Sequence, residues 1–168
     1  MAEDNRESSG KPLTNRWMHA MYIGFFAGLI WGALKILLYL IKFTKVIPGF
    51  LAEPFFKNEF LKTWNGHVIG LLFFIVFSIA AALLYTALFV KHKGPWIGLF
   101  YGLAWWAVLY LLVGPPSGMM KSIRLLDTNT LLADLCLFTL WGVFIGFSIS
   151  YEFTDERVRE PGALGSNR

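Results

Sequence analysis

Four long apolar stretches constrain this chain more than any other feature of its sequence. They cover residues 17–41, 67–90, 96–113 and 130–151, and their only acidic or basic residues besides histidine are Lys35 and Asp134. The hydrocarbon core of a bilayer is about 30 Å thick and takes roughly 20 helical residues to cross, because each residue rises about 1.5 Å. The sequence therefore predicts an all-α protein, a bundle of four transmembrane helices.

The composition excludes several other classes of protein. Charged residues make up 15% of the chain and hydrophobic residues 56%, whereas soluble domains are roughly 25% charged. A single cysteine excludes an internal disulfide framework and a cysteine-based metal cluster. The net charge of +4 is scattered along the chain, so no nucleic-acid partner is expected.

The polar segments between the spans predict the topology. Residues 1–16 are expected to form a disordered tail, residues 17–151 the transmembrane domain and residues 152–168 a second tail. An even number of spans places both tails on one side, and that side carries slightly more Lys and Arg, including Lys91 and Lys93 in the shortest connection. Because such residues favour the cytoplasmic side, both termini are predicted to be cytoplasmic.

The long first outer connection, residues 42–66, has a pattern of its own. From Pro54 onward, aromatic residues alternate with charged ones at helical spacing. This pattern predicts a short amphipathic helix lying in the membrane interface, with Trp64 at headgroup level. The segment could act as a lid over the bundle, or it could simply rest on lipid.

Small residues at four-residue spacing predict close helix packing, because helices in lipid gain little from burying apolar surface. They are Gly24, Gly28 and Gly32 in the first span, Gly98 and Gly102 in the third, and Gly142 and Gly146 in the fourth. Residues 22–38 also match residues 96–112 at an offset of 74, including two of these glycines and a tryptophan. A weaker match joins residues 74–79 to 144–149 at an offset of 70. The first match suggests a parallel repeat of two helical hairpins.

Ionisable side chains within hydrocarbon are costly and often functional. Counting helical rise places Lys35 and Asp134 at nearly one depth, so we predict an intramembrane ion pair between the first and fourth spans. The alternative is that Lys35 reaches the headgroups and water reaches Asp134. His67 opens the second span and is a possible proton site, although it could also merely face water.

Several kinds of site are not expected. The sequence contains no zinc-protease motif, phosphate-binding loop or serine-hydrolase motif, so we predict no catalytic residues, no cofactor and no metal site. Four tryptophans near mid-membrane could line a cavity, but aromatic packing is the simpler interpretation; they are Trp31, Trp105, Trp106 and Trp141. Cys136 is interpreted as a small apolar side chain.

Four segments resemble the YqhR-type conserved membrane proteins of spore-forming Gram-positive bacteria. They are residues 22–28 with Lys35, residues 64–67, residues 96–102 and residues 114–116. The resemblance covers essentially the whole chain and implies a location in the bacterial plasma membrane. A fainter similarity to YagU-like inner-membrane proteins rests mainly on the placement of Lys35, His67, Pro115, Pro116 and Asp134. Neither family implies a biochemical activity.

Two functional hypotheses follow. The first is a non-enzymatic envelope or scaffold protein that contacts membrane lipid and packs against itself or a partner membrane protein through glycine-rich helix faces. The second is a small oligomeric proton-linked transporter or channel that uses Lys35, Asp134 and His67. Four helices leave little room for a pore within one monomer, which favours the first hypothesis.

Overall fold

The computed structural model describes residues 16–89, 95–116 and 126–158. Within these ranges all regular secondary structure is helical, and there is no strand. Four helices are long and apolar enough to cross a membrane, over Trp17–Leu40, Trp64–Phe89, Trp96–Val113 and Thr128–Tyr151. The predicted all-α bundle of four spans is confirmed.

Four long helices and three short helical segments build this bundle. In chain order they are α1 (Arg16–Leu40), the 3₁₀ helix η1 (Phe50–Ala52), α2 (Asn58–Leu61), α3 (Trp64–Phe89), α4 (Pro95–Ala107), the π-helical segment η2 (Val108–Val113) and α5 (Thr128–Val158). The helix η2 continues α4 directly, so the two together form the third span.

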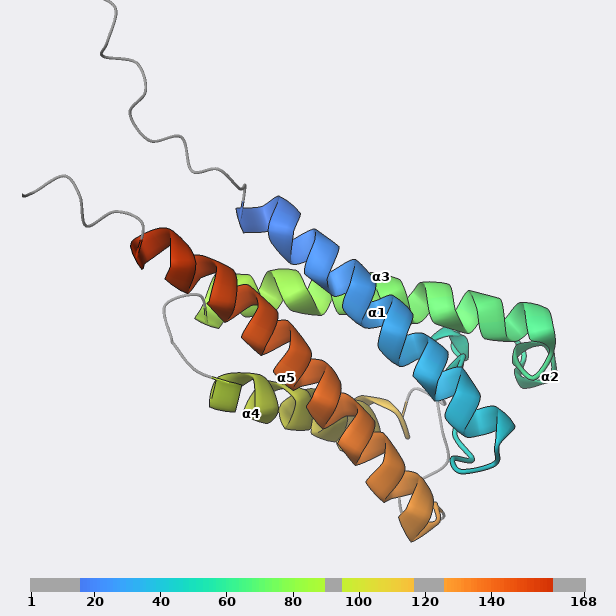
Figure 1. Ribbon diagram of the computed structural model, residues 1–168. Coiled ribbons are helices and arrows are strands. Elements are labelled where there is room, and N and C mark those ends of the chain that lie inside the picture. The colour runs from blue at the N-terminus through green and yellow to red at the C-terminus, as the bar shows by residue number, and fades with distance from the viewer. Residues whose placement is uncertain (1–15, 90–94, 117–125, 159–168) are drawn as a thin grey trace, which may run out of the picture.

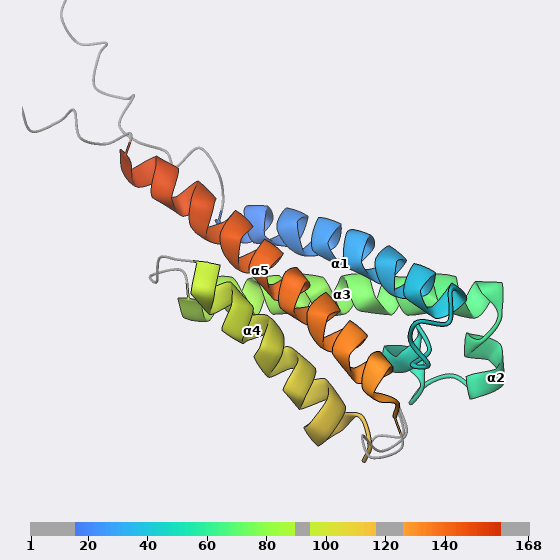
Figure 2. The same cartoon turned by 60° about the horizontal axis from the view of Figure 1, so that its bottom comes forward.

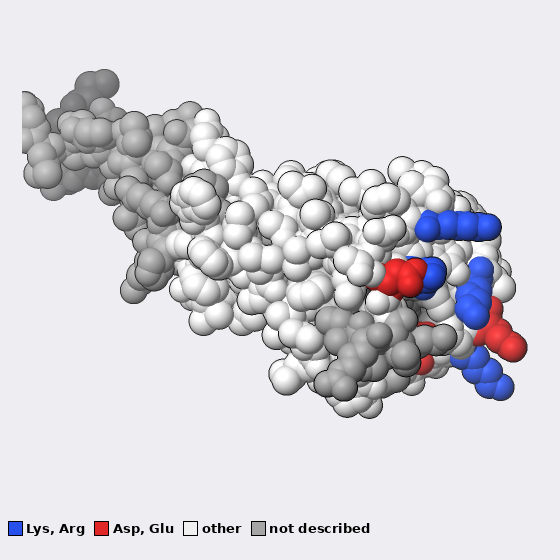
Figure 3. Space-filling model, turned by 90° about the horizontal axis from the view of Figure 1, so that it is seen from below, with Lys and Arg blue, Asp and Glu red and all other residues white. Residues whose placement is uncertain are grey.

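The bundle has two unlike ends. At one end, here called the termini end, α1 begins, α5 ends and α3 leads toward α4 (Figure 1). At the other, the loop end, residues 41–63 connect α1 to α3; we call these residues the cap (Figure 2). Among the described side chains, the charged ones with solvent exposure all belong to the cap or to Asp127, and they gather at this end (Figure 3).

Glycines bring α1 directly onto α3. A Cβ atom added to Gly24 would lie 2.6 Å from the Cα of Ile79, and one added to Gly28 would lie 2.6 Å from the Cα of Ile75. Gly32 meets a side chain instead, with the Leu71 Cδ1 at 2.5 Å. Since backbone blocks any side chain at the first two positions, alanine there requires the helices to move apart.

Close backbone packing at glycines also joins α4 to α5. A Cβ atom on Gly102 would lie 2.2 Å from the carbonyl oxygen of Phe138, and one on Gly142 would lie 2.4 Å from the Cα of Gly102. Gly98 and Gly146 form the next contact along the two helices, where a Cβ atom added to Gly146 would lie 2.5 Å from the Cα of Gly98. The seven predicted packing glycines thus lie between helices of one chain, and all are buried.

The contacts of these glycines extend the internal repeat to the second helix of each hairpin. Gly24 faces Ser78, Ile79 and Ala82, and its repeat partner Gly98 faces Gly142, Val143 and Gly146. The facing positions 78 and 142, 79 and 143, and 82 and 146 each differ by 64. Equivalent positions of α3 and α5 are therefore 64 residues apart, and the sequence match at an offset of 70 does not relate them.

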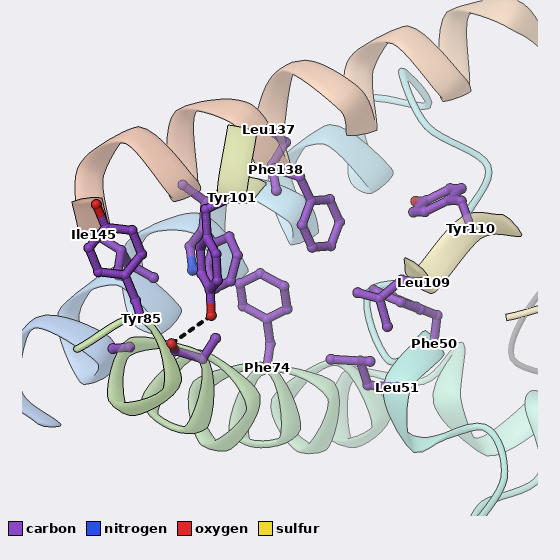
Figure 4. Packing of buried hydrophobic residues seen from close by; sticks show 14 of the residues in the cluster. Phe50, Leu51, Phe74, Tyr85, Tyr101, Leu109, Tyr110, Leu137, Phe138 and Ile145 are labelled. Atoms are coloured by element: carbon purple, nitrogen blue, oxygen red, sulfur yellow. Dashed lines mark hydrogen bonds between the residues drawn. The ribbon is translucent and has the colours of Figure 1, made fainter. Parts of the chain in front are cut away.

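Aromatic side chains fill the centre of the bundle (Figure 4). Trp141 is fully buried, stacks on Phe77 with ring centres 5.6 Å apart and donates from Nε1 to the Ser78 hydroxyl at 2.9 Å. The hydroxyl of Tyr101 donates to the Ala81 carbonyl at 2.7 Å. The four mid-membrane tryptophans all pack against other aromatic rings: Trp31 on Phe144, Trp105 on Phe77, Trp106 on Tyr110 and Trp141 on Phe77.

The cap differs from the amphipathic helix that its spacing predicts. From Pro54 onward, only Asn58–Leu61 is helical before α3 begins. The cap instead inserts apolar side chains into the loop end of the bundle, where Phe50, Leu51 and Leu61 are buried. Part of the predicted pattern remains, because Phe55 and Trp64 are 74% and 69% exposed. The spacing of residues does not predict this insertion, because it depends on a tertiary contact: the backbone of Gly49 in the cap packs directly against Gly70 of α3.

Candidate functional site

The two ionisable residues of the spans meet near the loop end. Lys35 on α1 is 2% exposed and Asp134 on α5 is fully buried. The Lys35 Nζ donates to the Asp134 Oδ1, which closes the ion pair between helices far apart in the sequence. Helical rise alone had placed the two at one depth, and the crossing of α1 and α5 supplies the lateral contact.

Two further side chains satisfy the other carboxylate oxygen. The hydroxyls of Tyr110 and Thr44 both donate to the Asp134 Oδ2, the latter at 3.1 Å. Tyr110 also accepts from the Lys35 Nζ at 3.4 Å. We call Lys35, Thr44, Tyr110 and Asp134 the polar cluster. Each oxygen of the carboxylate has a donor, which is what a buried charge requires.

A local change of helix type accompanies the placement of Tyr110. The segment η2 is π-helical, and its last turn ends with the Gly114 N–H donating to the Leu109 carbonyl at 2.8 Å. Such segments are rare and recur at functional sites. Within this segment Tyr110 is fully buried and stacks on Trp106 with ring centres 5.4 Å apart. The stacking holds the phenol ring, and its hydroxyl reaches the carboxylate.

The cap closes the polar cluster from the loop end. Thr44 belongs to the cap, and its hydroxyl also accepts from the Val46 N–H at 3.3 Å. The ring of Phe50 lies 5.7 Å from the Lys35 Nζ, within the range of a cation–π contact. The Lys45 N–H donates to the Thr130 hydroxyl on α5 at 3.2 Å. These contacts fasten the cap to the helices that carry the charges.

Outside the spans, one cap carboxylate is held in an unusual environment. Burial raises the pKa of Glu53 above its ordinary value, while a hydrogen bond from Asn58 and the charge of Lys62 act in the opposite direction. Its Oε2 is buried without a hydrogen-bond partner among the described residues. Desolvation therefore favours the protonated form of this carboxyl group.

His67 lies apart from the polar cluster. Its side chain is buried, and its ring packs edge-on against Tyr39 at 5.5 Å and Trp64 at 6.5 Å. The Nδ1 has no hydrogen-bond partner in the described part of the chain. None of the hydrogen bonds of the polar cluster includes His67, so the structure does not bring it together with Lys35 and Asp134.

The arrangement holds charge but offers little for binding a metal. Within the described ranges, no three His, Cys, Asp or Glu side chains come close enough to share a metal ion. Removing one partner from a buried ion pair usually costs about 3–5 kcal/mol, because the other charge is left uncompensated. What this site can do is fix the register of three helices and hold the cap.

Sequence reasoning missed Tyr110, Thr44 and Phe50. A buried tyrosine hydroxyl usually has a partner, so a tyrosine in a span at the depth of a lysine and an aspartate was an available signal for Tyr110. In the repeat alignment, position 109 corresponds to Lys35, which places Tyr110 one residue away. No comparable pattern marks Thr44 or Phe50, because the fold of the cap determines where they lie.

Comparisons with known proteins agree with this picture of a membrane bundle. The family model of the conserved membrane protein YqhR matches residues 1–162. The chain is similar to the uncharacterized protein YqhR of Bacillus subtilis (strain 168), with 32% identity over 146 residues, which cover 86% of this chain and 82% of the relative. No solved structure matches the chain.

Proposed function

The chain belongs to the YqhR family of conserved membrane proteins, as the resemblance predicted, and from this premise we propose that it is a non-enzymatic scaffold of the bacterial plasma membrane. Its role is to present a rigid cap at one membrane face, where partner membrane or envelope proteins bind. We infer that both termini are cytoplasmic, which places the cap on the outer face.

One observation carries this proposal: the polar cluster is closed. Lys35 and Asp134 have almost no exposed surface, both carboxylate oxygens have donors, and Phe50 covers the ammonium group. A charge that carries protons across a membrane needs access to water or to a neighbouring proton carrier. A closed pair instead supports a structural role, in which it fixes the register of the helices.

The mode of contact with partners differs from the glycine-face hypothesis. The seven packing glycines are buried between helices of the same chain, so these positions are occupied within the monomer. Partner contact therefore falls to the loop end, where Phe55 of the cap and Trp64 at the start of α3 are exposed. The exposed charged side chains also gather at this end (Figure 3). Aromatic residues of this kind are frequent at the centres of protein interfaces.

The test combines flux with the mobility of the cap. The purified protein is reconstituted in liposomes, and proton and cation flux is compared with that of Asp134→Asn at matched protein density between pH 5 and 8. The scaffold proposal expects no flux in either sample. It also expects faster backbone hydrogen exchange in residues 44–61 of Asp134→Asn, because Thr44 loses a charged acceptor.

Asp127→Asn is the matched control for this experiment. It removes a carboxylate at the same end, one that pairs with Lys45 at the exposed surface, and it should leave the exchange of the cap nearly unchanged. Proton flux that requires Asp134 would overturn the scaffold proposal. Equal hydrogen-exchange rates of the cap in wild type and Asp134→Asn would contradict the part of the proposal in which the polar cluster keeps the cap rigid.

The second candidate is an oligomeric proton-linked transporter. The observation that favours it is an ionisable pair between repeat-related hairpins, since transporters often place such residues at the interface of internal repeats. This candidate expects flux that depends on Lys35 and Asp134, with His67 as a further proton carrier. Because His67 lies outside the polar cluster, flux that changes in His67→Gln would specifically support transport.

A further inference from the structure

An apolar groove lies between α1 and α5 at the loop end, on the lipid-facing side of the bundle. It has a volume of about 370 Å³. Its walls come from α1, from the cap and from one stripe of α5, and they consist of Leu34, Leu38, Phe43, Asn129, Leu132, Ala133, Cys136, Leu137 and Leu140. Every lining residue except Asn129 is apolar or weakly polar, so the groove suits a hydrocarbon ligand.

The length of the groove matches one leaflet of a bilayer. The α5 stripe runs from Asn129 to Leu140, which corresponds to about 16 Å at about 1.5 Å of helical rise per residue. Half of a hydrocarbon core of about 30 Å is about 15 Å. The groove therefore extends from the start of α5 to about the bilayer midplane, the depth that one acyl chain occupies.

The polar end of the groove carries positive charge. Asn129 lines it directly, Lys42 precedes the lining residue Phe43 in the chain, and Lys45 follows two residues after it. Lys45 pairs with Asp127, so the charges of these two cancel. Lys42 is exposed and has no ion-pair partner in the described part of the chain, so the described residues next to the groove lining carry one net positive charge.

The backbone conformation of Lys42 determines where Phe43 lies. Lys42 has a φ of 60°, the left-handed region that lysine rarely adopts. The turn ends α1, and the Phe43 N–H donates back to the Leu38 carbonyl at 2.8 Å. As a result, Phe43 joins Leu38 in the wall of the groove instead of continuing the helix.

We propose that this groove binds one acyl chain of an anionic membrane phospholipid, with the phosphate at Lys42 and Asn129. The apolar stripe takes the hydrocarbon, the net charge at the opening favours an anionic headgroup, and the length fits a single leaflet. The site uses Lys42 and Phe43 at the start of the cap, whereas the surface proposed for partner proteins lies around Phe55 and Trp64, which do not line the groove. The groove is lined by α5, the helix that also carries Asp134, so a bound lipid would contact the same helix that contributes to the polar cluster.

Native mass spectrometry of the purified full-length protein tests this site. The protein is titrated with dioleoyl phosphatidylglycerol or dioleoyl phosphatidylcholine, and the bound lipids are counted. Wild type should bind the first phosphatidylglycerol at least fivefold more tightly than phosphatidylcholine. Lys42→Gln should lose this preference, and Cys136→Trp, which fills the groove, should lose the tight first site altogether.

Two matched variants serve as controls. Lys57→Gln removes another exposed cation of the cap, and Val76→Trp adds the same indole to an exposed position of α3 that is 67% accessible. Both should bind phosphatidylglycerol as wild type does. Equal affinity for the two lipids, or tight binding retained in Cys136→Trp, would overturn the proposal. So would a dimer that dissociates in Cys136→Trp, because the groove would then hold a second copy of the chain.

A second measurement avoids any risk that Cys136→Trp fails to fold. Cys136 is the only cysteine of the chain and lines the groove, where it is exposed. Its alkylation by a membrane-permeant maleimide should slow severalfold when phosphatidylglycerol replaces phosphatidylcholine in nanodiscs of wild type, but not in nanodiscs of Lys42→Gln. The same rate in both lipids for wild type would contradict the proposal.

Discussion

The two halves of this bundle are held together by different physics. Toward the termini end and the centre, backbones touch at glycines, so α1 lies on α3 and α4 lies on α5 at distances that exclude a side chain. Toward the loop end, a glycine contact, between Gly49 and Gly70, holds the cap on α3, and a charged pair and two hydroxyls connect α1, η2, α5 and the cap. Glycine contacts join helices in pairs, whereas the polar cluster joins elements of both hairpins.

This comparison explains why the repeat is symmetric in one half only. The glycines recur at equivalent positions of the two hairpins. The charged residues do not recur. At the offset of 74, Lys35 corresponds to Leu109, and at the offset of 64, Asp134 corresponds to Gly70. The duplicated packing therefore builds each hairpin, and the unique polar residues lock one hairpin to the other.

The strongest way to break the polar half is to leave one charge unpaired. Lys35→Met should lower the free energy of unfolding by about 3–5 kcal/mol, because Asp134 then remains buried without a counter-charge. The double variant Lys35→Met with Asp134→Leu should recover most of this loss. Both are measured by reversible unfolding in detergent micelles. A double variant as unstable as Lys35→Met would show that the pair does not account for the loss.

A hydrogen bond from tyrosine to the carboxylate gives the next largest effect. Tyr110→Phe keeps the ring on Trp106 but removes one donor to Asp134, which should cost about 1.5–3 kcal/mol, the usual value for hydrogen bonds to charged groups. The same unfolding assay measures it. The hydroxyl also contacts Lys35, so the reference background is Lys35→Met with Asp134→Leu, which lacks both partners. There Tyr110→Phe should not destabilise the fold, and an equal loss in both backgrounds would contradict a role through the ion pair.

The glycine half should respond to a single methyl group. Gly102→Ala places a Cβ atom against the Phe138 carbonyl and should destabilise the fold by about 1–3 kcal/mol through overpacking. Ala104→Val adds volume on the same helix at an exposed position and should change stability by less than about 0.5 kcal/mol. The comparison would fail if the two variants were equally stable in unfolding experiments.

The smallest effect concerns pH and the cap. Because burial raises the pKa of Glu53 above its ordinary value of 4.5, the folded cap binds a proton more tightly than the unfolded chain does. Its contribution to stability is therefore complete below pH 4.5 and is lost as the pH rises through the raised pKa. Hydrogen exchange of residues 50–61 should increase over that range in wild type.

Glu53→Gln provides the contrast for the pH experiment. Glutamine does not titrate, so this variant should lose the pH dependence of cap exchange, while Glu59→Gln, at an exposed cap position, should keep it. A wild-type cap whose exchange, corrected for the intrinsic chemical rate, does not change with pH would contradict the assigned environment of Glu53.

Particular residues show how far sequence reasoning reached. Lys35 and Asp134 stood out because a charge in an apolar span is rare, and helical rise gives depth directly. The packing glycines stood out through their four-residue spacing, although the spacing does not say which helix each one faces. The spacing from Pro54 onward predicts a short helix, and the structure limits that helix to Asn58–Leu61, since aromatic and charged alternation fits both an interfacial helix and a loop whose apolar residues turn inward.

Hydropathy, small-residue spacing and the rarity of buried charge are local properties, so the sequence by itself determined the four helices, their close-packing positions and the two residues of the ion pair. The tertiary structure alone decided that α1 pairs with α3 and α4 with α5, that the π-helical turn brings Tyr110 to Asp134, and that the cap inserts Phe50 and Thr44 over the pair. These outcomes depend on the space left between helices once they pack, and no local pattern along the chain records that space.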